Sequence, residues 1–136
     1  MTQEIVLVPV LRAGISLLRP IEENLQNCRV AFAGFYRDEV TLEPQEYYFK
    51  YPNIKNHKST KVYILDPVIS TGGTVAVKIT KLKAVGAKNI SVIGILAEYQ
   101  GINHILALHP DVKIYLADLN EEANEGDTGD RVFQTL

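Results

Sequence analysis

Short apolar runs that alternate with helix-like patterns are the strongest constraint on the fold of this 136-residue chain. The runs are rich in β-branched and aromatic side chains, as expected of buried strands. Strands that are apolar on both faces and alternate with helices predict an α/β fold with a parallel sheet covered by helices on both faces. The predicted strands are Ile5–Val10, Arg29–Phe35, Val62–Leu65, Ile90–Ala97 and Val112–Ala117.

Three segments between these runs carry apolar residues at helical spacing. They are Leu18–Leu25, Val75–Leu82 and Ile102–Leu108. In the first of them, Pro20 is tolerable only near the start of a helix, because proline has no backbone N–H. Gly86 follows the second segment at the place where a glycine commonly ends a helix.

The composition fits one compact domain, residues 1–136, in which 46% of residues are hydrophobic and 22% are charged. A net charge of −2 gives no electrostatic reason to expect nucleic acid or an anionic membrane as a partner. Cys28 is the single cysteine, which excludes an intramolecular disulfide. No secretory signal pattern and no long apolar run are present, so we expect a cytoplasmic protein.

One region interrupts the alternation of strands and helices. Residues 36–52 read YRDEVTLEPQEYYFKYP, with charged ends and an aromatic cluster. We interpret this region as a β-hairpin flap that projects from the sheet. The polar segment Asn53–Thr60 connects the flap to the next strand.

The loop after Val62–Leu65 predicts a phosphate site. It reads DPVISTGGT, residues 66–74, and leads into a helix whose first N–H groups have no partner and whose dipole favours an anion. Gly72 and Gly73 let the backbone approach a phosphate closely, and Asp66 can accept hydrogen bonds from sugar hydroxyls. A turn in which Thr71 or Thr74 caps the helix is the structural alternative. The loop lacks the lysine of a Walker A motif and the GxGxxG pattern of dinucleotide folds.

This strand–Asp–(x)3–STGGT–helix arrangement resembles the phosphoribosyl pyrophosphate (PRPP) signature of the type I phosphoribosyltransferases. Asp66 is followed by Pro67 where many members have a second acidic residue, which resembles the uracil phosphoribosyltransferases in particular. The resemblance implies that Asp66 orients the ribose and that the backbone of Ser70–Thr74 fixes the 5′-phosphate. On this resemblance the PRPP contacts of the loop are Asp66, Pro67, Val68, Ile69, Ser70, Thr71, Gly72, Gly73 and Thr74.

Two other segments resemble the pyrophosphate-binding parts of the same family. VPVLRAG, residues 8–14, places Arg12 after the first strand, although an arginine there could also be an ordinary surface residue. YRDEVTLEPQEYY places Arg37 in the flap, where a charge run is usually solvated. The resemblance assigns both arginines to the pyrophosphate, and we interpret Asp38 and Glu43 as structural.

The tail EGDTGDR, residues 125–131, resembles the GDxGDR segment of the family, although alone it could be a polar turn. The resemblance implies that Gly126, Asp127 and Thr128 contact uracil and that Asp127 also contacts PRPP. Two departures stand beside this likeness. The chain begins almost at its first strand, where the family has a helical N-terminal portion, and the preceding base loop is short and acidic at 120–126 (NEEANEG).

The expected reaction joins uracil to PRPP, giving UMP and pyrophosphate, in an enzyme of the glycosyltransferase type that serves pyrimidine salvage. Arg12, Arg37 and Asp66 are the expected catalytic residues, with Mg²⁺ held by the substrate pyrophosphate rather than by assigned protein ligands. We expect a homo-oligomer and assign structural roles to the three histidines. The alternatives are a PRPP-binding regulatory protein that has lost catalysis and a flavodoxin-like module for another phosphate. The histidines are His57, His104 and His109.

Overall fold

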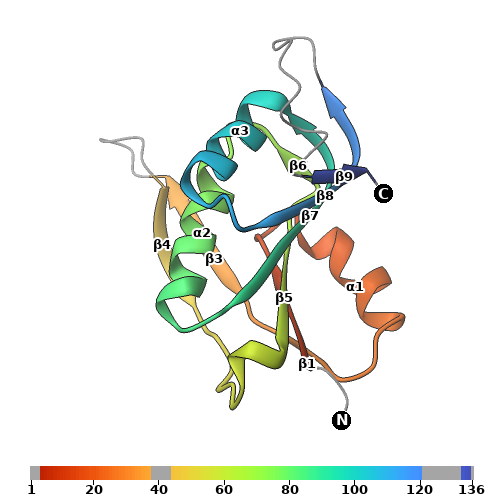
Figure 1. Cartoon of the computed structure of the whole chain (residues 1–136), viewed down its shortest axis with the longest axis vertical. Helices are drawn as coiled ribbons and strands as arrows, with labels where there is room; N and C mark the ends of the chain where they lie inside the picture. Colours follow the sequence, from red (N-terminus) through yellow and green to blue (C-terminus); the bar gives the residue numbers. More distant parts are fainter. Residues whose placement is uncertain (1–3, 38–43, 121–132, 136) are drawn as a thin grey trace.

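The computed structural model describes residues 4–37, 44–120 and 133–135 (Figure 1). The described elements are, in chain order, β1 (Glu4–Pro9), α1 (Ile15–Glu23), β2 (Cys28–Val30), β3 (Ala33–Arg37), β4 (Pro44–Phe49), the short 3₁₀ helix η1 (His57–Ser59), β5 (Thr60–Leu65), β6 (Val68–Ile69), α2 (Gly73–Ala84), β7 (Asn89–Glu98), α3 (Tyr99–Leu108), β8 (Lys113–Asn120) and β9 (Phe133–Thr135). From β1 to β8 they alternate between strands and α-helices, except from β2 to β6, where strands and one short 3₁₀ helix follow one another.

A parallel sheet forms the centre of the molecule. Its described strands lie in the order β2-β1-β5-β7-β8-β9, and the two-residue strand β6 pairs with the end of β7. Every pairing in this sheet is parallel, so the carboxyl ends of the strands meet at one edge. The predicted α/β fold with a parallel sheet is therefore confirmed.

Helices lie on both faces of the sheet (Figure 1). Helices α2 and α3 cover the face on which Val62, Ile64 and Val92 are buried, and these side chains form one apolar cluster with Ile79 and Leu82 of α2. On the opposite face α1 packs against β1 and β5. None of the described helices is long and apolar enough to cross a membrane.

Helix α1 corrects the expectation for Pro20. The proline lies inside the nine-residue helix rather than near its start. Proline cannot donate to the carbonyl of Ser16, but both residues are exposed, so water can satisfy that carbonyl. No residue of α1 is buried, and Ile15 is 49% exposed, so loose packing tolerates an irregular helix.

The end of α2 agrees with the prediction made for Gly86. This glycine has a φ of 104°, and its N–H donates to the carbonyl of Lys83. The N–H of Ala87 donates to the carbonyl of Leu82, which completes a Schellman motif.

The predicted strand Arg29–Phe35 is wrong as a single element. Pairing with β1 ends where the N–H of Ala31 donates to the carbonyl of Leu7, 2.9 Å away. The chain then leaves the parallel sheet, and β3 pairs with β4 in a separate antiparallel sheet with a register shift at Gly34/Phe35. The hairpin expected in this region is thus present, and it begins at Ala33.

Candidate functional site

The loop of residues 66–74 lies at the carboxyl edge of the sheet, between β5 and α2. Its central part is β6, which pairs with Leu96 and Ala97 at the end of β7. The loop surrounds a hollow of about 300 Å³. The residues that line this hollow are Asp66, Val68, Ile69, Ser70, Thr71, Gly72, Thr74 and Val75.

The first turn of α2 begins beside this hollow, and its residues Thr74 and Val75 line it. Gly72 is the N-cap residue, with a φ of 82°, and no side chain caps the helix. The amides of Gly73, Thr74 and Val75 have no acceptor within the helix. Among described residues, the one polar contact to them joins Gly73 N to Thr71 Oγ1 at 3.4 Å, which is long for a hydrogen bond. This geometry leaves the amides available to an anion and does not support a threonine cap.

Two glycines make a close backbone contact that fixes the loop against α3. A Cβ atom on Gly72 would clash with the carbonyl oxygen of Gly101. A Cβ atom on Gly101 would in turn clash with the carbonyl oxygen of Ser70. Both positions therefore require glycine for reasons of space, and Gly72 also requires it for its positive φ.

Asp66 lines the hollow and directly follows the last residue of β5. Its N–H donates to the carbonyl of Ile93 on β7, 3.0 Å away. Burial raises the pKa of the Asp66 carboxyl to about 6, and a hydrogen bond from the Val68 N–H opposes part of that rise. In its ionised form this carboxylate only accepts hydrogen bonds, which suits the hydroxyl groups of a sugar.

The turn that carries Arg12 lies against the same strand end. The N–H of Val10 donates to the carbonyl of Leu65 at 2.9 Å, and the N–H of Gly14 donates to that of Val10 at 2.7 Å. A Cβ on Gly14 would clash with the Leu65 carbonyl, so glycine is required for this close approach. The peptide bond between Leu11 and Arg12 is cis, and Arg12 is exposed. The structure thus brings the Arg12 turn to the residue that directly precedes Asp66.

Of the remaining predicted site residues, Arg37 is described by its backbone pairing, and the tail residues are not described. Arg37 is the last residue of β3 and pairs with Pro44 of β4. Gly126, Asp127 and Thr128 lie outside the described residues, as do Asp38 and Glu43. The predicted roles of Arg37 and of the tail therefore stay predictions.

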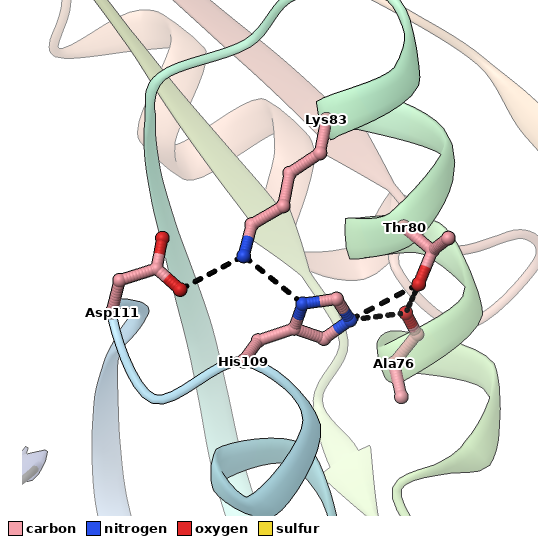
Figure 2. Close-up of polar contacts among 5 residues, drawn as sticks. All are labelled: Ala76, Thr80, Lys83, His109 and Asp111. Atoms are coloured by element: carbon pink, nitrogen blue, oxygen red, sulfur yellow. Dashed lines mark hydrogen bonds and ion pairs between the residues drawn. The ribbon is translucent and has the colours of Figure 1, made fainter.

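His109 joins α2 to the segment between α3 and β8 (Figure 2), and it is not among the residues that line the hollow. The side chain is buried, with 7% of its surface exposed. Nδ1 lies 3.1 Å from Lys83 Nζ, while Nε2 lies 3.1 Å from Thr80 Oγ1 and 3.2 Å from the Ala76 oxygen. An ammonium group can only donate, so Nδ1 accepts and Nε2 carries the ring proton toward Ala76. Lys83 also pairs with Asp111 at 2.8 Å, and this hydrogen bond lowers the pKa of the Asp111 carboxyl.

The other two histidines do not line the hollow either. The His57 ring lies beside Gly86, where a Cβ would be 2.8 Å from its Nε2, and His104 is exposed on α3. None of the three histidines lines the hollow of the loop, and the structural roles expected for them stay a prediction.

Gly94 and Gly101 also shape the site, although neither was among the residues predicted for it. A Cβ on Gly94 would lie 2.9 Å from the carbonyl oxygen of Asp66, so the absence of a side chain on β7 makes room for the loop. A glycine in the first turn of an apolar helix was the available signal for Gly101. The predicted helix began at Ile102, which left Gly101 outside it.

Comparison with known proteins identifies relatives over nearly the whole chain. The family model described as uracil phosphoribosyltransferase matches residues 1–135. A uracil phosphoribosyltransferase of Fervidobacterium nodosum is 40% identical over 98% of this chain and 67% of its own length. That of Shouchella clausii is 42% identical over 95% of this chain and 65% of its own. The chain thus spans about two thirds of the length of these relatives.

Solved structures agree with the fold. A protein from Aquifex aeolicus superposes with a TM-score of 0.77 at 33% identity, covering 96% of this chain and 65% of that one. A purine phosphoribosyltransferase from Pyrococcus horikoshii superposes with a TM-score of 0.66 at 20% identity, over 85% of this chain and 70% of that one. At the lower identity, the likeness concerns the fold alone.

Proposed function

Because the chain belongs to the uracil phosphoribosyltransferase family, we propose that it transfers the phosphoribosyl group of PRPP to uracil, giving UMP and pyrophosphate. The observation that carries this proposal is the open first turn of α2 beside Asp66. Amides without a helical acceptor suit a phosphate, and a carboxylate that lines the same hollow suits a ribose.

In this proposal, different described residues bind different parts of PRPP. The amides of Gly73, Thr74 and Val75 would hold the 5′-phosphate, with hydroxyl donors from the loop. The Asp66 carboxylate would accept hydrogen bonds from the ribose hydroxyls and so fix the anomeric carbon. Displacement at that carbon passes through a state with cationic character, so positioning and charge stabilisation supply most of the catalysis.

Arg12 would stabilise the negative charge that grows on the leaving pyrophosphate. Its turn lies against the end of β5, directly before Asp66, and its charged side chain would meet the anion held at the loop. We assign Arg37 the same task from the family resemblance, and assign Gly126, Asp127 and Thr128 to uracil, with Asp127 also on PRPP.

Mg²⁺ fits this site through the substrate. Among the described residues no group of three or more histidine, cysteine, aspartate or glutamate side chains could hold a metal ion. Asp66 is the carboxylate at the hollow, and one carboxylate with substrate phosphates is a common way to bind Mg²⁺. The ion would neutralise charge on the pyrophosphate. A cytoplasmic location and a homo-oligomeric state, with neither nucleic acid nor membrane as a partner, complete the proposal.

Calorimetric titration with PRPP and Mg²⁺, followed by a pyrophosphate-release assay with uracil, tests the function. Binding with uracil-dependent release supports the transferase. Binding without release would indicate the regulatory alternative, which the short acidic segment at 120–126 favours. A protein that binds simple nucleotides as well as PRPP would contradict both.

Arg12→Ala tests the assignment of the arginine to the pyrophosphate. A charge-assisted hydrogen bond is worth roughly 1.5–3 kcal/mol, so we expect kcat/KM for PRPP to fall about 10- to 150-fold. The matched control is Arg19→Ala, which removes an exposed arginine from the neighbouring helix α1. An Arg12→Ala enzyme with full turnover would remove Arg12 from the mechanism.

A further inference from the structure

Gly101 occupies a position where glycine weakens the element that contains it. It is the third residue of α3, and it is buried. Glycine inside a helix costs about 0.5–1 kcal/mol relative to alanine, because it loses more backbone freedom on folding. Its φ lies outside the positive region that favours glycine, so α3 alone gives no reason for this residue.

The reason lies in the contact with the loop of residues 66–74. A Cβ on Gly101 would clash with the carbonyl oxygen of Ser70, and would lie 3.1 Å from Ser70 C and 3.2 Å from Ile69 Cγ2. From the other side, a Cβ on Gly72 would clash with the Gly101 oxygen and lie 3.1 Å from Gly101 C. The closest of these contacts join backbone to backbone, so moving a flexible side chain cannot relieve them.

Helix α3 is the firmer partner in this contact. Tyr99, Ile102 and Ile105 are at most 2% exposed, and His109 ties the segment after the helix to α2. The loop is softer, since Ser70 and other residues at its tip are exposed. A side chain added at Gly101 therefore displaces the loop rather than the helix.

We infer that Gly101 is a positioning residue for the phosphate-binding loop. Through Ser70 and Gly72, the first turn of α3 sets where the amides at the start of α2 point. This inference rests on the proposed function, because it assigns Gly101 to the site that binds the 5′-phosphate of PRPP.

Gly101→Ala tests the inference, and Ala107→Gly is its matched control. Ala107 is exposed on the same helix, and replacing it with glycine weakens the helix without adding atoms near the loop. For Gly101→Ala we expect the Kd and KM for PRPP to rise at least tenfold, while the KM for uracil changes less than threefold. Small misplacements of binding groups commonly have effects of this size. For Ala107→Gly we expect a lower Tm with an unchanged Kd for PRPP.

The outcomes separate the inference from the proposed function. A wild-type chain that does not bind PRPP would remove both. Wild-type binding with an unchanged Kd in Gly101→Ala would overturn the inference alone. Equal losses of affinity in Gly101→Ala and Ala107→Gly would also overturn it, since they would reflect helix stability.

Hydrogen exchange of the wild-type chain covers the case in which Gly101→Ala does not fold. If the contact positions the loop, saturating PRPP slows amide exchange in residues 72–75 and also in 99–102, but not in 106–108. Slower exchange confined to residues 72–75 would contradict the inference.

Discussion

Asp66 combines a largely buried position with a proposed task that requires negative charge. Burial at the end of β5 raises its pKa to about 6, while a sugar hydroxyl is best accepted by the ionised carboxylate. The folded chain without ligand therefore holds this proton more tightly than the unfolded chain does. The ionised Asp66 carboxylate therefore lowers the stability of the ligand-free protein at neutral pH. We attribute this loss of stability to the proposed role of the carboxylate in binding the ribose.

The sign of the resulting pH dependence follows from the raised pKa. The ordinary value is 3.8, so the stabilising effect of protonated Asp66 is complete below that pH and is lost as the pH rises through about 6. We expect Asp66→Asn to raise the free energy of unfolding at pH 7.5 by on the order of 1–2 kcal/mol and to lower PRPP affinity. Urea unfolding at pH 4 and pH 7.5, with calorimetry, measures both effects.

The control for this prediction is Asp118→Asn, which changes an exposed aspartate on β8. It should leave PRPP affinity unchanged. If Asp66→Asn instead lowers the free energy of unfolding of the ligand-free protein at pH 7.5, the ionised carboxylate stabilises the fold, and the prediction is wrong.

Single residues were predictable from the sequence where they belong to one contiguous motif. Asp66 and the loop up to Thr74 could be identified because a strand, a loop and a helix start follow one another directly. Gly101 could not, because its partners, Ser70 and Gly72, belong to a different segment. Glycine is required at position 101 because of a contact between two backbone segments. Such a contact cannot be recognised from the spacing of residues in the local sequence.

Helix α2 carries the loop at its first turn and is held along its side by His109. The imidazole donates toward the Ala76 carbonyl and accepts from Lys83, so it links the helix to the turn before β8 (Figure 2). Because this link lies on the flank of α2, we expect it to support the helix as a whole.

His109→Ala should therefore lower the stability of the protein by about 2 kcal/mol, through lost packing and lost hydrogen bonds in a buried place. The Kd for PRPP should change less than threefold. The ion pair between Lys83 and Asp111 and the contact between the loop and Gly101 do not involve His109, so both remain in the variant. Urea unfolding and calorimetry test this pair of results. The control His104→Ala, on the exposed side of α3, should change neither quantity, and a large loss of PRPP affinity in His109→Ala would show that the link sets the loop.

Two elements differ from their predictions because they depend on features of the folded chain that the local sequence pattern does not contain. The segment from Arg29 to Phe35 has no proline or charged turn that would divide it. It is divided because its first part pairs with β1 and its second part with β4, and strand pairing depends on partners distant in the sequence. The same limit applies to Pro20, since exposure of α1 decides whether an interior proline is tolerated.

At the scale of the whole molecule, the sequence predicted parallel strands but not their order. Alternating strands and helices indicate a parallel sheet, whereas the neighbours β1 and β5 are separated by the hairpin and its connector. This order matters for function, because it places the Arg12 turn beside Asp66.

The site draws on β1, β5, β7, α2 and α3, so its geometry exists only in the folded chain. A ligand that binds only this state stabilises it by about 2.7 kcal/mol at 100 times its Kd. We expect saturating PRPP to raise the Tm by roughly 10 °C, measured by scanning calorimetry. A chain that binds PRPP with no change in Tm would show that the loop keeps its affinity after the rest has unfolded.

The backbone contact between Gly72 and Gly101 has a consequence for the lifetime of the protein. It joins two segments far apart in the sequence, so neither the loop nor α3 can open without loosening the other. Proteases cleave chains in proportion to how often they open, when opening and closing are fast. Substrate bound at the loop should therefore also protect α3 from digestion, and the supply of PRPP would help to set how long each copy of the enzyme survives.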